Sequence, residues 1–210
     1  MKKQQIQELF EIFREANPIP KGELNYTNTY TLLVAVALSA QATDVGVNKA
    51  TKSLFHKVST PQEMLNLGLE GLVEHVKTIG LYPTKSKNVI AAAQMLVENH
   101  GGIVPNNQKA LEALPGVGRK TANVVRNIGF GEPLIAVDTH ILRFCNRTGL
   151  AKAKTPEKLM DILPKKVPKE FLHDAHHWMI LHGRYICTAR SPKCKECFLQ
   201  HLCAFKEKKL

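Results

Sequence analysis

The chain has 210 residues, of which 44% are hydrophobic and 22% charged, and its formal net charge is +11. A chain of this length folds as one domain or two small ones and buries its core without disulfide bonds. The positive charge favours a polyanionic partner, above all nucleic acid, but aromatic residues are too few for a base-stacking RNA-binding sheet. The longest apolar run is too short to span a membrane, and no signal peptide is visible at the start. We therefore expect a cytoplasmic protein with no membrane partner.

Apolar residues recur at helical spacing along most of the chain, and capping and stop signals bound these stretches. In the first half of the chain, the predicted helices are one closed by Asn17-Pro18, one along 47–58, one opened by a capping box at 60–63 and stopped by Gly68, and a continuation of the helical period along 72–79. Those that follow are one capped by Thr84 and ended by Gly101-Gly102, one opened by Thr155-Pro156, and one along 171–182. The apolar run 31–38 fits a buried strand or a buried helix equally, and 135–137 is the only other strand-like stretch. We predict an all-α fold of ~10 helices. Because no Gly-, Pro- or Ser-rich linker divides the chain, we expect two helical lobes with a cleft between them.

The most informative segment is 111–122, with the sequence L-E-A-L-P-G-V-G-R-K-T-A. A short helix from about Gln108 to Ala113 ends at Pro115-Gly116, and a second helix begins near Arg119. Gly116 and Gly118 permit a tight turn that brings the backbone close to a ligand. The N–H groups at the start of the second helix favour an anion, which on a basic protein indicates a DNA phosphate. Such a helix–hairpin–helix element binds the phosphate backbone without reading bases, although a simple helix connection is the alternative. The residues we expect to contact DNA here are Leu114, Gly116, Val117, Gly118 and Arg119.

Two residues downstream of the turn are candidates for catalysis. Lys120, just inside the second helix, is either one more phosphate contact or a nucleophilic amine, which a helix N-terminus and burial would help to keep uncharged. Asp138 follows the apolar triplet 135–137 and precedes a helix. It is a helix cap, a carboxylate that stabilises a developing sugar cation or manages a proton, or both.

Four of the five cysteines lie near the C-terminus, as Cys187, Cys194, Cys197 and Cys203. In a cytosolic chain this cluster indicates a metal site, and its spacing alone fits zinc and an iron–sulfur cluster equally. Lys193 lies within the loop and is expected to offer its charge to DNA. The isolated Cys145 is expected to be a small buried hydrophobe. The four histidines between 173 and 182 are interpreted as part of a buried helix stripe and not as a second metal site.

Two further segments have side chains suited to filling a gap in stacked bases. Gln41 lies in a turn of small residues, and its amide could hydrogen-bond an orphaned base. Ile79 and Leu81 lie in a loop flanked by lysines, where an apolar tip could act as a wedge. The alternative is that Ile79 and Leu81 close a helix end against the core.

Together, the 111–122 hairpin, the V-D-T-H segment at 137–140 and the terminal cysteines resemble the helix–hairpin–helix DNA glycosylases over nearly the whole chain. The resemblance implies a six-helix lobe at 21–132, containing the hairpin element at about 108–128. It also implies a second lobe from 1–20 and 133–210, with an iron–sulfur loop at 187–203 that holds a 4Fe–4S cluster. The roles implied are lysine attack on the sugar by Lys120, assistance by Asp138, and wedge residues in the loops of Gln41, Ile79 and Leu81.

The activity that the resemblance implies is base excision repair. We expect a bifunctional DNA glycosylase that removes oxidised pyrimidines from double-stranded DNA and cuts abasic sites by β-elimination through a lysine Schiff base. We expect it to act as a monomer on the nucleoid. Two alternatives are a monofunctional adenine DNA glycosylase, which lacks the nucleophilic lysine, and a non-catalytic DNA-binding module with a structural four-cysteine metal site.

Overall fold

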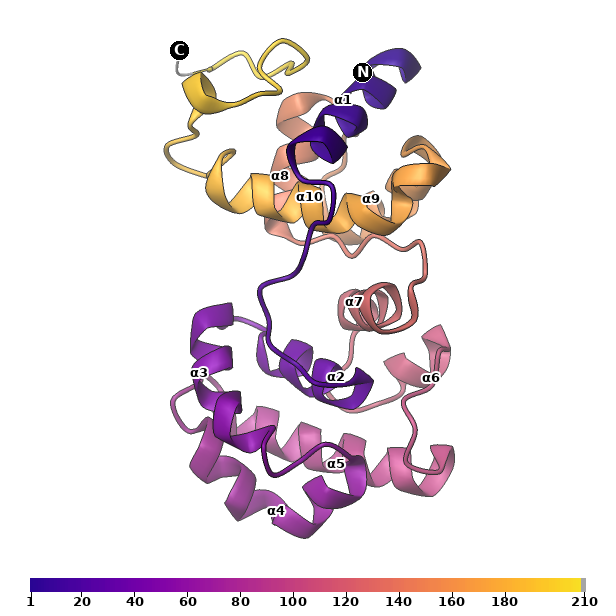
Figure 1. Ribbon diagram of the computed structural model, residues 1–210, viewed down its shortest axis with the longest axis vertical. Coiled ribbons are helices and arrows are strands. Elements are labelled where there is room, and N and C mark those ends of the chain that lie inside the picture. The colour runs from indigo at the N-terminus through magenta and orange to yellow at the C-terminus, as the bar shows by residue number, and fades with distance from the viewer. Residues whose placement is uncertain (209–210) are drawn as a thin grey trace. The chain divides into compact units, whose positions relative to one another are not determined.

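The computed structural model describes residues 1–208, which are helical with no β-strand (Figure 1). The α-helices are α1 (Lys3–Ala16), α2 (Thr29–Leu38), α3 (Asp44–Leu54), α4 (Pro61–Val76), α5 (Tyr82–His100), α6 (Gln108–Glu112), α7 (Arg119–Phe130), α8 (Thr139–Thr148), α9 (Pro156–Lys166) and α10 (Leu172–Tyr185). Two 3₁₀ helices, η1 (Lys169–Phe171) and η2 (Cys194–Glu196), complete the set. The all-α prediction is confirmed.

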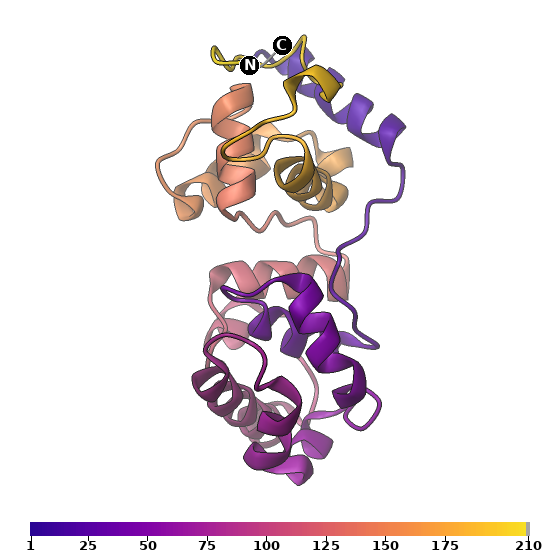
Figure 2. The ribbon, with the colours of Figure 1, turned by 90° about the vertical axis from the view of Figure 1, so that its left-hand side faces the viewer.

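The chain divides into two compact units, each with its own hydrophobic core. One unit is the continuous segment Glu23–Gly131, which contains α2 to α7. The other joins Met1–Gly22 to the residues from Glu132 onward, so that the first helix packs with the last ones (Figure 2). This second unit therefore depends on contacts between the two ends of the chain.

Local capping chemistry begins several helices where the sequence predicts it. The Thr60 side chain accepts a hydrogen bond from the Glu63 N–H, and the Glu63 carboxylate accepts one from the Thr60 N–H. This is the predicted capping box. Thr155 likewise caps α9. Gly68 (φ 72°, ψ 174°) breaks the helical path inside α4, as its stop signal indicates, but the helix resumes beyond it.

Two local expectations are resolved or corrected. The ambiguous run 31–38 is helix α2, capped by Asn28 and buried on almost every side, so no polar face marks its period. Thr84 does not cap α5, because the helix begins two residues earlier, at Tyr82, with Leu81 as its N-cap residue.

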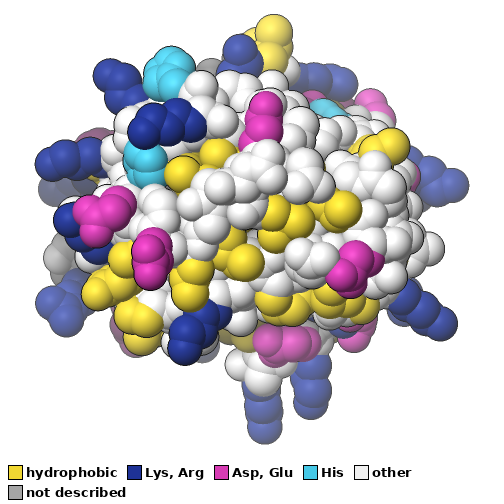
Figure 3. Space-filling view, turned by 90° about the horizontal axis from the view of Figure 1, so that it is seen from below, with side chains coloured by type: hydrophobic (Ala, Val, Ile, Leu, Met, Phe, Trp, Pro, Cys, Tyr) yellow, Lys and Arg dark blue, Asp and Glu magenta, His cyan; other side chains and the backbone are white. Residues whose placement is uncertain are grey.

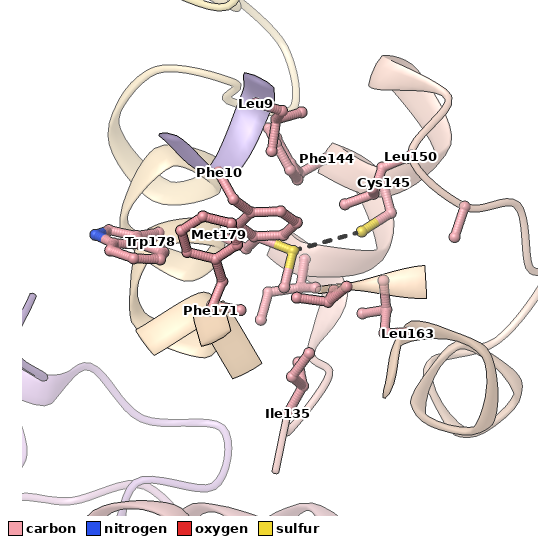
Figure 4. Close-up of a cluster of buried hydrophobic side chains, with 14 of the residues drawn as sticks. Leu9, Phe10, Ile135, Phe144, Cys145, Leu150, Leu163, Phe171, Trp178 and Met179 are labelled. Atoms are coloured by element: carbon pink, nitrogen blue, oxygen red, sulfur yellow. Dashed lines mark hydrogen bonds between the residues drawn. The ribbon is translucent and has the colours of Figure 1, made fainter. Parts of the chain in front are cut away.

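The core of the second unit is aromatic and brings together α1, α8 and α10 (Figure 4). Phe10 stacks on Phe171 at 5.6 Å, and the indole N–H of Trp178 donates to the backbone oxygen of Asn17 at 2.8 Å. Cys145 is fully buried, with its sulfur 3.9 Å from that of Met179, so its predicted structural role is confirmed. The strand-like triplet 135–137 is buried as irregular chain and forms no β-strand.

The surface is mixed in character. Figure 3 shows a face on which apolar patches lie among charged side chains of both signs. Within the described residues, no helix is both long enough and apolar enough to cross a membrane.

Candidate active site and metal centre

The segment between α6 and α7 forms the predicted hairpin, and its two glycines have different roles. Gly116 has a φ of 78°, in the left-handed region, and a Cβ there would lie 3.0 Å from the Cβ of Asn88. Gly118 has a φ of −94°, which any residue adopts, and a Cβ there would meet no atom within 4 Å. The backbone turn therefore requires glycine at 116, whereas glycine at 118 leaves open space above the backbone.

Some backbone N–H groups of the hairpin are hydrogen-bonded within the protein, and others are exposed. The N–H groups of Leu114 and Val117 donate to the carbonyls of Leu111 and Leu114, and both side chains are buried. These two residues, expected above to contact DNA, therefore anchor the hairpin in the core. The N–H groups of Gly116 and Gly118 are exposed and donate no hydrogen bond within the described residues. They are the donors available to an anion.

Two cationic side chains lie at the same helix end. Arg119 and Lys120 are the first residues of α7, and both are exposed. Within the described part of the chain, the Lys120 amine has no hydrogen-bond or ion-pair partner. An exposed amine thus lies on the same helix end as the free glycine donors.

Asp138 is positioned by the buried residues that precede it and by the helix that follows it. Ala136 and Val137 before it are buried, which fixes the backbone that leads into it. Its carboxylate accepts a hydrogen bond from the Ile141 N–H at 2.9 Å and so caps α8, as predicted. The second carboxylate oxygen accepts no hydrogen bond within residues 1–208. Half-buried and oriented by the cap, Asp138 has one oxygen left for chemistry.

The two predicted wedge loops contain the only non-glycine residues between 1 and 208 with positive φ. These are Gln41 (φ 55°) and Leu81 (φ 61°), and both side chains are exposed. A non-glycine residue in the left-handed region costs about 1 kcal/mol, and such strain gathers at functional sites. Ile79, by contrast, is 4% exposed and packs into the core. Its predicted role as a wedge is therefore replaced by that of a core residue.

The four C-terminal cysteines are all partly buried and line one cavity, which is partly open to solvent. Besides the cysteines, the cavity is lined by Arg147, Thr148, His182, Ile186, Pro192, Lys193 and Phe205. Lys193, expected to offer its charge to DNA, is exposed at this cavity and lies 3.9 Å from the Glu196 carboxylate.

Two arginines of α8 fix the backbone of the cysteine loop. Arg143 donates from Nε to the carbonyl of Cys187 at 2.8 Å and from a terminal nitrogen to that of Gly183 at 2.6 Å. Arg147 donates to the carbonyls of Thr188 and Ala189, and its guanidinium lies 4.6 Å from the ring centre of Phe205. These contacts tie the loop to the core, and the spacing of the arginines on one helix face was the sequence signal that could have indicated them.

His182 also faces the cysteines. Its Nε2 lies 3.4 Å from the sulfur of Cys197. Burial lowers the pKa of His182 to about 4. The interpretation of His182 as a residue of a buried stripe thus omits its contact with the loop, because sequence spacing does not reveal which loop returns to a helix.

The cavity has the donor set that an iron–sulfur cluster requires. Thiolates that share one zinc lie about 2.3 Å from it, which places their sulfurs about 4 Å apart. A 4Fe–4S cluster takes one thiolate per iron, so its ligands surround a larger body. Four soft sulfur donors around a shared cavity match this requirement.

Comparisons with known proteins agree with these features. Residues 34–169 match the family of HhH-GPD superfamily base excision DNA repair proteins, and residues 187–203 match the iron–sulfur binding domain of endonuclease III. Endonuclease III of Haemophilus influenzae is 56% identical over 96% of this chain and 95% of the relative. That of Escherichia coli is 55% identical over 99% of both chains. The solved structure of a non-covalent endonuclease III–DNA complex superposes with a TM-score of 0.90, at 44% identity over 97% of this chain and 95% of that one.

The fold and the site thus define a helix–hairpin–helix protein of base excision DNA repair. Within that superfamily the chain belongs to the endonuclease III family. It is accordingly a DNA glycosylase and AP lyase that carries a 4Fe–4S cluster.

Proposed function

We propose that this enzyme removes oxidised pyrimidines from double-stranded DNA and then cuts the strand at the abasic site. The observation that carries the proposal is the exposed Lys120 amine at the start of α7, beside a hairpin with free backbone donors. A solved structure 44% identical to this chain is of a trapped covalent intermediate between endonuclease III and DNA, which supports a nucleophilic residue. Because its substrate is chromosomal DNA, we expect the enzyme on the nucleoid in the cytoplasm, acting as a monomer.

The hairpin supplies sequence-independent affinity. The free N–H groups of Gly116 and Gly118 bind a phosphate oxygen at the positive end of α7, and Arg119 adds charge. Lys193 provides a second basic contact from the cysteine loop. We assign Cys187, Cys194, Cys197 and Cys203 as the cluster ligands, whose binding stabilises the loop that bears Lys193.

Lys120 and Asp138 share the chemistry. The neutral amine of Lys120 bonds to the sugar C1′ as the bond between C1′ and the base breaks, and the base leaves with a proton. Ring opening gives a Schiff base, and loss of a C2′ proton then expels the 3′ phosphate, which cuts the strand. The free oxygen of Asp138 stabilises the positive charge that develops on the sugar and accepts protons in these steps.

The hairpin glycines test DNA binding apart from folding. Gly118→Ala places a methyl group in the open space that a phosphate would occupy, so DNA affinity should fall about tenfold while the thermal midpoint stays unchanged. Gly116→Ala should destabilise the protein by about 1 kcal/mol or more, because its backbone is left-handed and Asn88 lies close. Fluorescence anisotropy and thermal melts measure the two effects. Normal affinity in Gly118→Ala would remove the hairpin from the DNA interface.

Lys120→Gln tests the nucleophile. Borohydride should trap a covalent adduct between the wild-type enzyme and DNA that contains one thymine glycol, and the variant should yield none because it has no amine to form the imine. Lys109→Gln is a matched control, since Lys109 is an exposed lysine on the preceding helix α6. A normal adduct yield in Lys120→Gln would place the nucleophile elsewhere, and base release without any adduct in the wild type would indicate a monofunctional glycosylase.

Asp138→Asn separates the carboxylate's charge from its cap. The asparagine amide oxygen still caps α8, so stability and DNA affinity should change little. Base release in single-turnover assays should slow by at least about 100-fold, because the charge that stabilises the sugar cation is lost. Activity within about threefold of wild type, ~0.7 kcal/mol of barrier, would reduce Asp138 to a helix cap.

The strained residues Gln41 and Leu81 are proposed to fill the gap left by the flipped nucleotide. Gln41→Ala and Leu81→Ala should slow excision of a damaged base that has to be extruded, and affect cutting at a preformed abasic site less, since that site opens easily. Val45→Ala, which truncates another exposed apolar residue of the same unit, should change neither rate. Equal loss of both activities together with thermal stability in the two variants would show a structural role only.

A further inference from the structure

His182 occupies a closed setting against the cysteine loop. It lies on α10, is 5% exposed, and is one of the residues that line the cysteine cavity. Phe144 and Phe198 contact its ring in edge-on geometry at centroid distances of 5.3 and 5.2 Å, and Phe13 does so at 5.5 Å. Three aromatic rings thus fix the orientation of the imidazole. Its Nε2 lies 3.4 Å from the Cys197 sulfur, within the range of a hydrogen bond to sulfur.

The direction of this hydrogen bond follows from the chemistry of a cluster ligand. A cysteine bound to iron is a thiolate without a proton, and its sulfur can only accept. The Nε2 atom of His182 must then carry the hydrogen and donate it, which fixes the tautomer of the ring. The surrounding aromatic side chains keep water from competing, so the hydrogen bond is stronger than an exposed one.

We propose that His182 raises the reduction potential of the 4Fe–4S cluster by donating its Nε2–H to the sulfur of Cys197. The proposal rests on the assignment of Cys197 as a cluster ligand. A hydrogen bond withdraws electron density from the thiolate, and this stabilises the state with the additional electron more than the state without it. His182 is a positioning residue in this scheme, because it acts through Cys197 and touches neither DNA nor the reacting sugar.

The nitrogen donor that Arg147 directs at a second ligand sulfur has a different setting from that of His182. A guanidinium nitrogen of Arg147 lies 3.7 Å from the Cys187 sulfur, but this arginine also binds two loop carbonyls. Replacing Arg147 would therefore release the loop as well as remove a donor. His182 contacts the loop through one side-chain hydrogen bond and the ring of Phe198, and an apolar replacement can still pack against that ring. Its replacement therefore removes the donor and leaves the loop's hydrogen bonds to Arg147 in place.

The test compares three variants of the cluster-containing protein. His182→Leu keeps an apolar group of similar size in the aromatic setting and removes the donor, whereas His182→Gln retains an N–H at about the same reach. His177→Gln is the control, because His177 is a buried histidine of the same helix that does not line the cavity. Each protein is first checked for four irons per chain. The midpoint potential of the one-electron couple is then measured on DNA-modified electrodes, where the electrode supplies or accepts the electron.

The expected result is a lower midpoint potential in His182→Leu, a potential close to wild type in His182→Gln, and no shift in His177→Gln. An unchanged potential in a fully loaded His182→Leu protein would overturn the proposal. Borohydride trapping through Lys120 should persist in His182→Leu, so failure of the present proposal and failure of the proposed nucleophile remain distinguishable.

A second measurement does not depend on the variants folding. The wild-type protein is prepared with ¹⁵N-labelled histidine, and its cluster is brought to a paramagnetic state for pulsed electron paramagnetic resonance. A weak coupling to one histidine nitrogen should be detected, because His182 is the one histidine within residues 1–208 that lines the cavity. The absence of any such coupling would show that no histidine hydrogen-bonds a cluster ligand.

Discussion

The unpaired N–H groups in the first turn of every α-helix are the constraint on which this enzyme depends. Where a side chain satisfies them, as Thr60 and Thr155 do, the helix end is only structural. The N-cap residues of α5 and α7, Leu81 and Gly118, provide no side-chain cap. Both belong to segments proposed to contact DNA. In α5 the Tyr82 N–H donates to the Ile79 carbonyl and Pro83 has no N–H, so of these two helix ends the one with donors open to an anion is that of α7.

Asp138 caps a helix and also has a free oxygen. One oxygen satisfies the first turn of α8, and the other accepts no hydrogen bond within the described residues. The cap holds the carboxylate in a single orientation, which is what electrostatic stabilisation of a developing charge requires. The observed cap and the proposed catalytic role of Asp138 are therefore compatible, because the cap would orient the carboxylate for that role.

Much of the fold and of the site could be predicted because the signals are local. The capping box at Thr60, the left-handed Gly116 and the cap by Asp138 each depend on a few adjacent residues. Helix α2 could not be distinguished from a strand, since burial on nearly all sides removes its polar face. Similarly, no local sequence signal shows which of Ile79 and Leu81 is buried and which is exposed. The outcome depends on the left-handed turn at Leu81, which sends one side chain into the core and the other into solvent.

Contacts between segments far apart in the sequence could not be predicted from such local signals. The sequence indicates a four-cysteine site but not that Arg143, Arg147 and His182 would converge on its loop from α8 and α10. These three residues link the loop to the aromatic core that the first and last helices build together. The cluster is thereby coupled to the stability of its unit, because metal-binding free energy contributes to the folding of the loop.

The exposure of Lys120 bears on how the reaction is confined to damaged DNA. A nucleophilic amine has to lose its hydration shell before it attacks, and α7 leaves this amine open to water. The missing desolvation must then come from the nucleotide itself once it is extruded and bound. Gln41 and Leu81 would fill the gap in the stack from strained positions that are already set in the free protein. In this scheme the hairpin and the proposed wedge residues are already in place in the free enzyme, and the proposed nucleophile would gain a dry environment only with the substrate bound.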